Sequence, residues 1–553
     1  MFCSRRRANR LTCTLSNQKA GLSRFFYCVI TCKLAALIVL RFKTLALLAK
    51  LKIKSLPITL LLLVSLGAWQ QAKANTLVWG TAFHAEPQQL VDELDANSNF
   101  INHLLFDPLF LLDQQGRIAP RLITKWKIIS PTQIQFELRS GVVFHSGNPL
   151  TAEDVEWTFQ QLSQQAHLHA LFAPIKSLKA LNTLQFEVRT YRPFSELIQR
   201  LSFIFPADKQ FYTTEENTSS SFAVSGTGPF KVSRYVPGIV TEFEIHSSYW
   251  RTNRSNVQRI KVVPIKQAEM RMASLFSRDV DIVDHVPENY VELLNKDKQL
   301  SVIQTEGLKW LAIELNQRNP ALDNRRVRQA LNLAIDNIRL AEVLGPYALA
   351  STQLSIPGQA GYNAELLPRY NLLLAHQLLQ QAGYEKGFKL TMAVPESLFG
   401  DQSKVVSQLV SMLDRVNISL QPQWLSDQDY QLAVDSCSSD LVLTRRQGDA
   451  GNVLSIARAM FLSEGEPITD EGGPCEAYQN DKISQLILAG EQELDEEKRA
   501  KIIQYLEQQI YQEAVFVPLY WQRKIWALNQ RIDIKNMNRA SPFPLFEQLQ
   551  VLD

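Results

Sequence analysis

The chain has 553 residues, of which 46% are hydrophobic and 20% are charged, and its formal net charge is +3. This is the composition of an ordinary globular protein, which excludes a largely disordered or fibrous chain. Only residues 213–224 (TTEENTSSSFAV) have the composition of a polar loop. The length is sufficient for at least two domains.

Residues 50–74 have the pattern of an export signal. Lysines precede an apolar core from Leu56 to Trp69, and a small-residue AKA segment ends at Ala74. The apolar run is too short for a comfortable membrane span, and no stop-transfer pattern follows it. We therefore predict cleavage between Ala74 and Asn75 and a soluble mature protein in the periplasm. No cysteine stands directly after the apolar core, in residues 70–75, so no lipid anchor is expected.

Residues 1–49 form an unusually long extension before this signal. They carry several arginines and a second apolar patch at residues 34–40. The extension is either a membrane-associated segment or the product of a misplaced translation start, and the sequence leaves both interpretations open.

Loss of this leader changes the net charge of the protein. Residues 1–74 contain 13 of the 58 basic residues and none of the 55 acidic residues, so the mature chain has a net charge of −10. An acidic protein without a basic stripe binds nucleic acid poorly. We therefore expect no nucleic-acid partner.

The first elements of the mature chain are predicted from their hydrophobic patterns. Residues 76–81 (TLVWGT) alternate like a short strand that leads into a loop, and residues 102–112 resemble a buried segment. Strict alternation over residues 133–139 (QIQFELR) predicts a half-buried strand. Thr151 then begins a predicted helix, with Asp154 at the positive end of the helix dipole.

The block around this helix start carries a family resemblance. Residues 138–159 (LRSGVVFHSGNPLTAEDVEWTF) resemble the pattern LRxGVxFHDGxPxTAeDVxxSl of extracytoplasmic solute-binding proteins of the oligopeptide, dipeptide and nickel class. Further matches follow in the expected order at residues 226–230 (GTGPF), 235–238 (YVPG), 248–250 (SYW), 271–287, 310–316 (WLAIELN), 322–331, 334–336 and 515–520 (VFVPLY). The chain is thus identified as a member of solute-binding protein family 5 of ABC transporters.

Several of these segments also have a purely structural interpretation. The glycines of residues 226–230 suit a tight backbone path, which predicts an architectural role. The charges of residues 324–328 (NRRVR) are expected to lie on a solvated helix face, with Val327, Leu331 and Ala334 buried on the other face. His145 is expected to complete a turn rather than bind a metal ion. His167 and His169 could chelate a metal only in an extended strand, and we expect no metal site there.

The resemblance implies an α/β fold of the two-lobed periplasmic binding protein type (type II, cluster C-like), with an extra subdomain. By analogy, hinges are expected near residues 308–316 and 517–527. The expected parts are lobe I at residues 75–307 and 526–553, an appended subdomain at 111–225 within it, and lobe II at 308–525.

The implied function is that of the solute-binding component of an ABC importer. The protein would capture a peptide between its closing lobes and deliver it, as a monomer without a cofactor, to the transmembrane subunits of an inner-membrane permease. The alternatives are a non-peptide solute such as a metal chelate, haem or an anionic small molecule, a peptide-binding chaperone or sensor, and an exported hydrolase. No GxSxG, HExxH or GxxxxGK motif is present, so we expect no enzyme.

The resemblance also suggests ligand-binding residues. Peptide-binding members use a Gly-Trp-x-x-Asp segment, in which the indole stacks on the ligand and the aspartate pairs with its ammonium group. Alignment with residues 441–449 places Asp449 on this aspartate and Arg446 where the tryptophan is expected. This departure favours Arg445 or Arg446 as the partner of an anionic ligand group. Alternatively, both arginines belong to a solvated loop.

The loop after the first strand is a second expected contact region. Phe83, His84 and Glu86 occupy the position where family members contact their ligand, and contact there remains an open alternative to a simple loop.

Cys437 and Cys475 are the two cysteines that follow the leader. Two cysteines in an exported chain predict one disulfide, with two separate buried thiols as the alternative. The segment around Cys475 (residues 473–480, GPCEAYQN) and the missing lipid anchor resemble the SapA-type branch, which is linked to antimicrobial-peptide sensitivity.

Overall fold

The structure is a computed structural model, and residues 73–553 form one compact unit within it. It describes residues 76–88, 98–112, 118–214, 223–251, 255–396, 402–447, 453–462, 480–533 and 546–552. The predicted export signal, its cleavage site at Ala74 and Asn75, and the extension before it lie outside the described residues.

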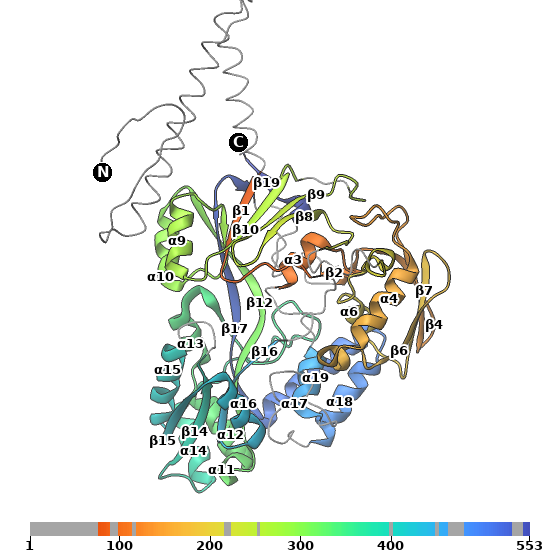
Figure 1. Cartoon of the computed structure of the whole chain (residues 1–553). Helices are drawn as coiled ribbons and strands as arrows, with labels where there is room; N and C mark the ends of the chain where they lie inside the picture. Colours follow the sequence, from red (N-terminus) through yellow and green to blue (C-terminus); the bar gives the residue numbers. More distant parts are fainter. Residues whose placement is uncertain are drawn as a thin grey trace, which may run out of the picture. The chain divides into compact units, whose positions relative to one another are not determined.

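A mixed eleven-stranded sheet is the frame of the described fold (Figure 1). Its strands run in the order β15-β14-β16-β12-β17-β11-β1-β10-β9-β8, and β13 also pairs with β17. They are β1 (Thr76–Thr81), β8 (Phe230–Val236), β9 (Val240–Ile245), β10 (Arg259–Pro264), β11 (Ile282–Val283), β12 (Leu300–Leu315), β13 (Ala348–Ala350), β14 (Phe388–Pro395), β15 (Ile418–Leu425), β16 (Leu441–Gln447) and β17 (Phe516–Asn529).

Strands β12 and β17 connect the two ends of this sheet. They have 16 and 14 residues and pair antiparallel from Leu300 with Asn529 to Glu314 with Phe516. On one side of the pair lies the β15 end, with β14 to β16, and on the other side lies the β8 end, with β1 and β8 to β11.

The predicted first strand is confirmed as β1. It pairs in parallel with β10 and β11, so that it lies inside the sheet rather than at an edge. Its alternating side chains Leu77 and Trp79 are fully buried. Around this end lie α3 (Ser98–Leu105), α9 (Ala268–Phe276), α10 (Glu288–Lys296), η4 (Phe546–Gln548) and the short pairs β2 (Phe110–Leu112) with β3 (Ile118–Pro120) and β18 (Ile532–Asp533) with β19 (Gln550–Val551).

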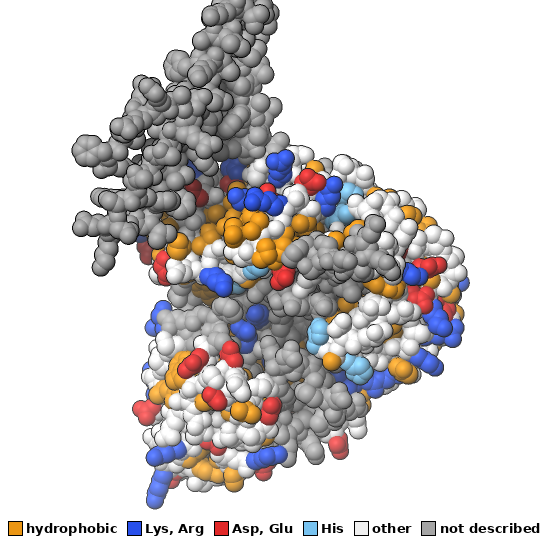
Figure 2. Space-filling model, viewed as in Figure 1, with side chains coloured by type: hydrophobic (Ala, Val, Ile, Leu, Met, Phe, Trp, Pro, Cys, Tyr) orange, Lys and Arg blue, Asp and Glu red, His pale blue; other side chains and the backbone are white. Residues whose placement is uncertain are grey.

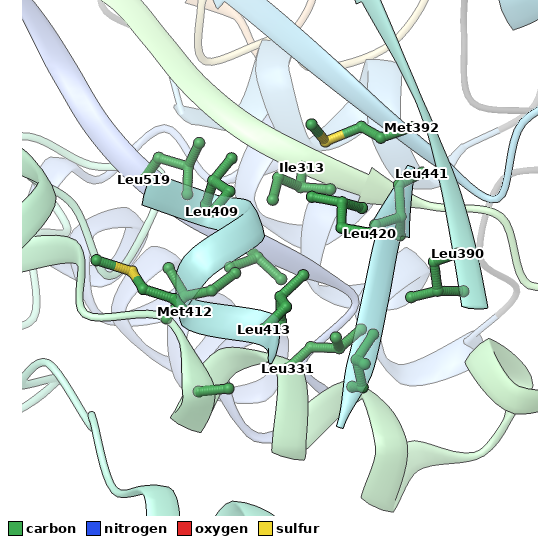
Figure 3. Close-up of a cluster of buried hydrophobic side chains, with 14 of the residues drawn as sticks. Ile313, Leu331, Leu390, Met392, Leu409, Met412, Leu413, Leu420, Leu441 and Leu519 are labelled. Carbon is green, nitrogen blue, oxygen red and sulfur yellow. The ribbon is translucent and has the colours of Figure 1, made fainter. Parts of the chain in front are cut away.

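At the β15 end, helices cover both faces of the sheet. On one face, Leu409 and Leu413 pack with Ile313, Leu420 and Leu441 of the strands (Figure 3). On the other face, helices pack against Trp310, Phe516 and Trp521 of the strands. The helices at this end are α11 (Pro320–Asp323), α12 (Arg325–Ala334), α13 (Asn337–Leu344), η2 (Gly345–Tyr347), α14 (Leu372–Gln381), α15 (Gln402–Asp414), α16 (Asp427–Ser436), α17 (Val453–Phe461), α18 (Asp481–Gln492) and α19 (Glu496–Glu513).

The arginine-rich start of α12 corrects one expectation. Arg328 is only 2% exposed, and its guanidinium donates to the carbonyls of Leu322, Asp323 and Glu513. Arg325 likewise donates to the Gln512 carbonyl. The prediction of a solvated face is therefore wrong for Arg328, because the last carbonyls of α19 lack partners within their own helix and attract cations.

A smaller antiparallel sheet builds a separate body, which we call the four-stranded body. Its strands run in the order β4-β5-β7-β6 and enclose their own core with α4. Strand β5 has the strict burial alternation predicted from its sequence. The elements are β4 (Ile123–Ser130), β5 (Gln133–Leu138), α4 (Ala152–Ser163), η1 (Ala166–Leu168), α5 (His169–Phe172), β6 (Ile175–Ala180), β7 (Gln185–Thr190), α6 (Leu197–Leu201) and α7 (Lys209–Tyr212).

The predicted start of α4 is confirmed. The Asp154 carboxylate accepts hydrogen bonds from the Thr151 backbone N–H at 2.8 Å and the Thr151 hydroxyl at 2.7 Å. The carboxylate therefore satisfies the backbone donor that precedes the helix and lies at the positive end of its dipole.

The glycines of the GTGPF segment are architectural, as predicted. A Cβ atom on Gly226 would lie 2.1 Å from the Leu105 carbonyl oxygen, and one on Gly228 would lie 2.4 Å from the Leu105 carbonyl carbon. His145 completes this turn, because the Gly226 N–H lies 3.4 Å from its Nδ1 and the Gly228 carbonyl lies 3.1 Å from its Nε2. Burial lowers the pKa of His145 to about 3.

A buried polar network fastens the four-stranded body to the β8 end. The Asp107 carboxylate accepts hydrogen bonds from Arg121 at 2.7 Å, from the Tyr249 hydroxyl at 3.0 Å and from the Trp250 indole at 2.8 Å. Arg121 also pairs with Glu547 at 2.9 Å. Breaking such a buried charge network is strongly destabilising, so this junction holds the two parts firmly together.

Candidate ligand-binding site

The loop after β1 is held at its start by a neighbouring loop. The Ala82 N–H donates to Asp284 at 3.2 Å, and the ring of Phe83 lies edge-on to His285 at 6.1 Å between centroids. The carboxyl ends of β1 and β11, which are parallel neighbours, therefore bring residues 82–86 and 284–285 together. Both segments follow a strand end, where loops of α/β sheets commonly meet ligands.

His84 connects this loop to the turn between β8 and β9. Its Nε2 accepts a hydrogen bond from the Gly238 N–H at 3.0 Å and lies 2.9 Å from the Tyr235 hydroxyl, and its ring stacks on Tyr235. Because Nε2 is an acceptor, the neutral ring carries its proton on Nδ1. Nδ1 is buried and has no hydrogen-bond partner among the described residues. The Nδ1–H of His84 is therefore an unused hydrogen-bond donor within this part of the chain.

Glu86 is exposed beside the same tyrosine. Burial raises the pKa of Tyr235, and the nearby negative charge of Glu86 adds to this effect. His84 and Glu86 thus lie beside Tyr235, whereas Phe83 of the same loop lies against His285. Their contact with a ligand stays a prediction.

Arg446, which the alignment places at the missing tryptophan, lies in a buried ion pair. Both its Nε and its terminal nitrogen lie 2.7 Å from one carboxylate oxygen of Glu314, which also accepts a hydrogen bond from the Thr444 hydroxyl at 3.1 Å. Arg446 and Glu314 are each 7% exposed. The positive charge of Arg446 is therefore already compensated within the protein, and the solvated-loop alternative does not describe this residue.

Arg445 extends to the opposite face of the sheet. Leu311 of β12 is paired with Arg445 on one side and with Tyr520 of β17 on the other, so Arg445 and Tyr520 share a face. Burial raises the pKa of the Tyr520 phenol, and the charge of Arg445 acts against this rise. The two adjacent arginines, predicted as alternatives for one role, therefore have different surroundings.

A cluster of aromatic side chains lies next to Arg446. Trp310 is paired with Arg446 across β12 and β16, and its indole N–H donates to the Ser351 hydroxyl at 3.0 Å. The ring of Trp310 meets Phe516 edge-on at 4.8 Å and lies 6.4 Å from Trp521. A buried indole thus stands beside Arg446, although on the neighbouring strand rather than in β16 itself.

Glu314 and Trp310 are site neighbours that the sequence analysis did not single out. A usable signal was present, because Glu314 is the one acidic residue in the strand segment at 310–316 and Arg446 follows a similarly apolar run. Complementary charges within otherwise apolar strands predict a buried pair.

Two predicted residues lie outside the described residues, namely Asp449 and Cys475. Cys437 follows α16 and is disulfide-bonded. Its pairing with Cys475 stays a prediction, as does the role of Asp449.

His167 and His169 lie in η1 and at the start of α5 rather than in a strand. Within the described ranges, no group of three or more histidine, cysteine, aspartate or glutamate side chains is arranged to hold a metal ion. None of the described helices is both long and apolar enough to cross a membrane. On the face shown in Figure 2, hydrophobic side chains gather near β10 and α3, whereas basic and acidic side chains are mixed elsewhere.

Residues 117–466 match the family described as bacterial extracellular solute-binding proteins, family 5 (middle), which is more than half of the chain. The protein belongs to this family. The match confirms the membership expected from the sequence segments, whereas the assignment to the SapA-type branch stays a prediction.

A curated relative matches more than half of the chain. The chain is 25% identical over 343 residues to the glutathione-binding protein GsiB of Pectobacterium atrosepticum, an alignment that covers 60% of this chain and 65% of the relative. The chain therefore spans slightly less than two thirds of the length of this curated relative.

Two solved structures show the same fold. HbpA2 of Haemophilus parasuis matches with a TM-score of 0.77 at 21% identity, over 86% of this chain and 100% of the other. The binding protein DppA of Helicobacter pylori, in complex with the peptide STSA, matches with a TM-score of 0.70 at 20% identity, over 88% and 100%. The expected α/β fold of a type II periplasmic binding protein is confirmed.

Proposed function

We propose that the protein is the periplasmic solute-binding component of an ABC importer. It captures peptides between two closing lobes and delivers them to the transmembrane subunits of an inner-membrane permease. The family match over residues 117–466 carries this proposal. A peptide ligand is supported by GsiB, which is named for binding glutathione, and by DppA, which was solved with a peptide.

The connection between the two ends of the main sheet supports closure. The pairing of β12 with β17 is irregular between Thr305 and Lys309 and again between Leu311 and Ala312, at and beside the predicted hinge at residues 308–316. Such irregularities interrupt the ladder and bend a strand locally. A ligand that touches both lobes only in the closed form shifts the population toward that form.

The surroundings of Arg446 favour a peptide over an anionic small molecule. An anionic ligand group at Arg446 would compete with Glu314 for a buried guanidinium. Asp449, by contrast, offers a carboxylate for the ammonium group of a peptide in the alignment with peptide-binding members. We propose that Asp449 and Arg445 contribute from lobe II, and that Phe83, His84 and Glu86 contribute from lobe I.

Native mass spectrometry of residues 75–553, purified from the periplasm of their own organism, tests this function. The bound material is released by denaturation and identified. Peptides of mixed sequence are the expected result. A single anionic molecule or metal chelate would replace the peptide proposal with the non-peptide alternative, and a protein that binds no solute would reopen the chaperone and hydrolase alternatives.

Export is tested separately. N-terminal sequencing of the periplasmic protein should give Asn75 as the first residue, and a chain that is intact through Lys73 would contradict cleavage of the signal.

A further inference from the structure

The loop between β7 and α6 touches a helix that lies far away in the sequence. The Ser195 N–H donates to the Glu491 carbonyl at 2.7 Å, and the Ser195 hydroxyl donates to the Gly490 carbonyl at 3.0 Å. Arg192 lies 3.5 Å from the Glu491 carboxylate. These contacts join the four-stranded body to the last turn of α18 (Figure 1).

The two partners belong to different hydrophobic cores. Phe194 and Leu197 are buried in the core of the four-stranded body. Helices α17 to α19, which we call the helical body, bury Leu454, Ile487 and Leu506 in a core shared with β12 and β17. The described contacts of Arg192 and Ser195 with α18 are therefore polar bonds between two separately built parts.

Each partner can separate without leaving a buried charge alone. The Glu491 carboxylate is held within the helical body by two bonds from Arg458, at 2.6 and 2.8 Å. The Gly490 and Glu491 carbonyls belong to the last turn of α18, where backbone acceptors lack helical partners and can bind water instead. The side chain of Arg192 is 41% exposed, so water can also replace its contact with Glu491.

The anchoring of the two bodies makes this contact sensitive to closure. The network of Asp107, Arg121 and Glu547 ties the four-stranded body to the β8 end. The helical body instead packs against Trp310 and Phe516, in the part of β12 and β17 that belongs to the β15 end of the sheet. Any rotation about β12 and β17 that separates the ends of the sheet therefore moves Ser195 away from α18.

We propose that Arg192 and Ser195 form a latch on the end of α18 that stabilises the closed form independently of ligand contacts. The proposal rests on the proposed function, because it needs two lobes that open and close. The cationic Arg192 at the C-terminal end of α18 is also favoured by the helix dipole. The latch sets how much of the protein is closed before ligand binds, and it thereby tunes apparent affinity and release.

The latch is tested by a double variant in a protein that carries two spin labels. The labels are attached at Lys176→Cys and Lys501→Cys, which are exposed positions on the four-stranded body and the helical body. Arg192→Ala/Ser195→Ala removes both side-chain contacts with α18. The matched control is Arg189→Ala/Ser202→Ala, because Arg189 and Ser202 bond to Glu187 and Gln199 within the four-stranded body. The distance between the two spin labels is measured by electron paramagnetic resonance, without peptide and with a tryptic digest of casein.

The latch variant should lower the ratio of closed to open protein by about threefold to tenfold, and the control should match the wild type. Higher peptide concentrations should then restore closure. The latch proposal would be overturned if the latch variant had the same ratio of closed to open protein as the wild type. It would also be overturned if the wild type showed a single distance between the labels under all conditions. If the wild type shows both the closed and the open distance but peptides do not change their proportions, the peptide function fails. The latch is still tested in that case, because the ratio of closed to open protein without peptide can be compared between the wild type and the latch variant.

Discussion

Arg446 shows at the scale of a single residue how one contact changes the meaning of a sequence motif. In the alignment it replaces a ligand-stacking tryptophan, which suggested a cation for an anionic ligand. In the structure its guanidinium is bound to Glu314 at 2.7 Å, and both side chains are buried. The partner is 132 residues away in the sequence, so no local pattern could reveal the pair.

Breaking this pair should destabilise the fold strongly. Arg446→Ala leaves the Glu314 carboxylate buried without its cation, and we expect a loss of about 3 to 5 kcal/mol in the free energy of unfolding, measured by urea denaturation. The control is Lys296→Ala, which removes an ion pair with Glu292 whose side chains are 70% and 83% exposed. That change should stay within about 0.5 kcal/mol. Equal effects of the two variants would contradict a structural role for Arg446.

Asp449 should instead act on ligand binding. If it pairs with the ammonium group of a buried peptide, Asp449→Ala should weaken affinity more than tenfold, or by about 1.5 to 3 kcal/mol. Isothermal titration with peptides recovered from the native protein measures this change. Asp435→Ala, on the exposed face of α16, is the control and should bind normally. Unchanged affinity in Asp449→Ala would remove this residue from the site.

At the scale of elements, the GTGPF segment fixes how α3 lies against the start of β8. Gly228→Ala would place a methyl group 2.4 Å from the backbone of Leu105, which cannot move as a flexible side chain could. We expect a loss of at least about 3 kcal/mol. Gly383→Ala is the matched control, because Gly383 has a φ of +84° but no atom within 4 Å of its added Cβ. It should cost only about 1 to 2 kcal/mol. Thermal unfolding of both variants separates steric overlap from backbone strain.

Glu507 of α19 gives an element-scale prediction about pH. It accepts hydrogen bonds from the Leu354 N–H and from both the N–H and the hydroxyl of Ser355, and burial raises its pKa from 4.5 to about 7. The folded protein therefore holds a proton that the unfolded chain has already lost between these pH values. Its contribution to stability is thus largest below about pH 4.5 and declines as the pH rises to about 7.

Glu507→Gln should remove this decline. The difference in unfolding free energy between wild type and variant should change by on the order of 3 kcal/mol between pH 4.5 and 7, measured by urea denaturation at each pH. His103 and His145, whose pKa values burial lowers to about 4 and about 3, act in the opposite direction but are common to both proteins. If the unfolding free energies of the two proteins changed with pH in the same way, a raised pKa of Glu507 would be contradicted.

The elements were more predictable from the sequence than their contacts were. Alternation at residues 133–138 and the Thr151 and Asp154 pair are local signals, and the structure confirms both. The solvated face expected for the charges of residues 324–328 failed at Arg328, because one of its acceptors is the Glu513 carbonyl at the end of α19, 185 residues later. Local patterns specify an element, whereas the burial of a charge depends on which distant backbone groups need a partner.

At the scale of the whole molecule, the family and fold could be expected because the matching segments are spread from residue 138 to residue 520. The ligand could not be predicted in the same way. Its proposed contacts come from the loop after β1 and from the end of β16, which are more than 350 residues apart in the sequence. The fold places β1 and β16 in one sheet with β12 and β17, but the solute depends on a few side chains in the loops that follow these strands.

The pairing of β12 with β17 also has a consequence for how the chain matures. Strand β17 begins at Phe516, about 200 residues after the end of its partner, yet it lies in the middle of the sheet between β12 and β11. A chain that emerges from a membrane channel with its N-terminus first cannot complete its sheet until nearly the last segment has passed. Non-local pairing of this kind slows folding and leaves strand edges exposed to aggregation. The strands that we propose as the hinge of the mature protein would therefore also time its folding after export.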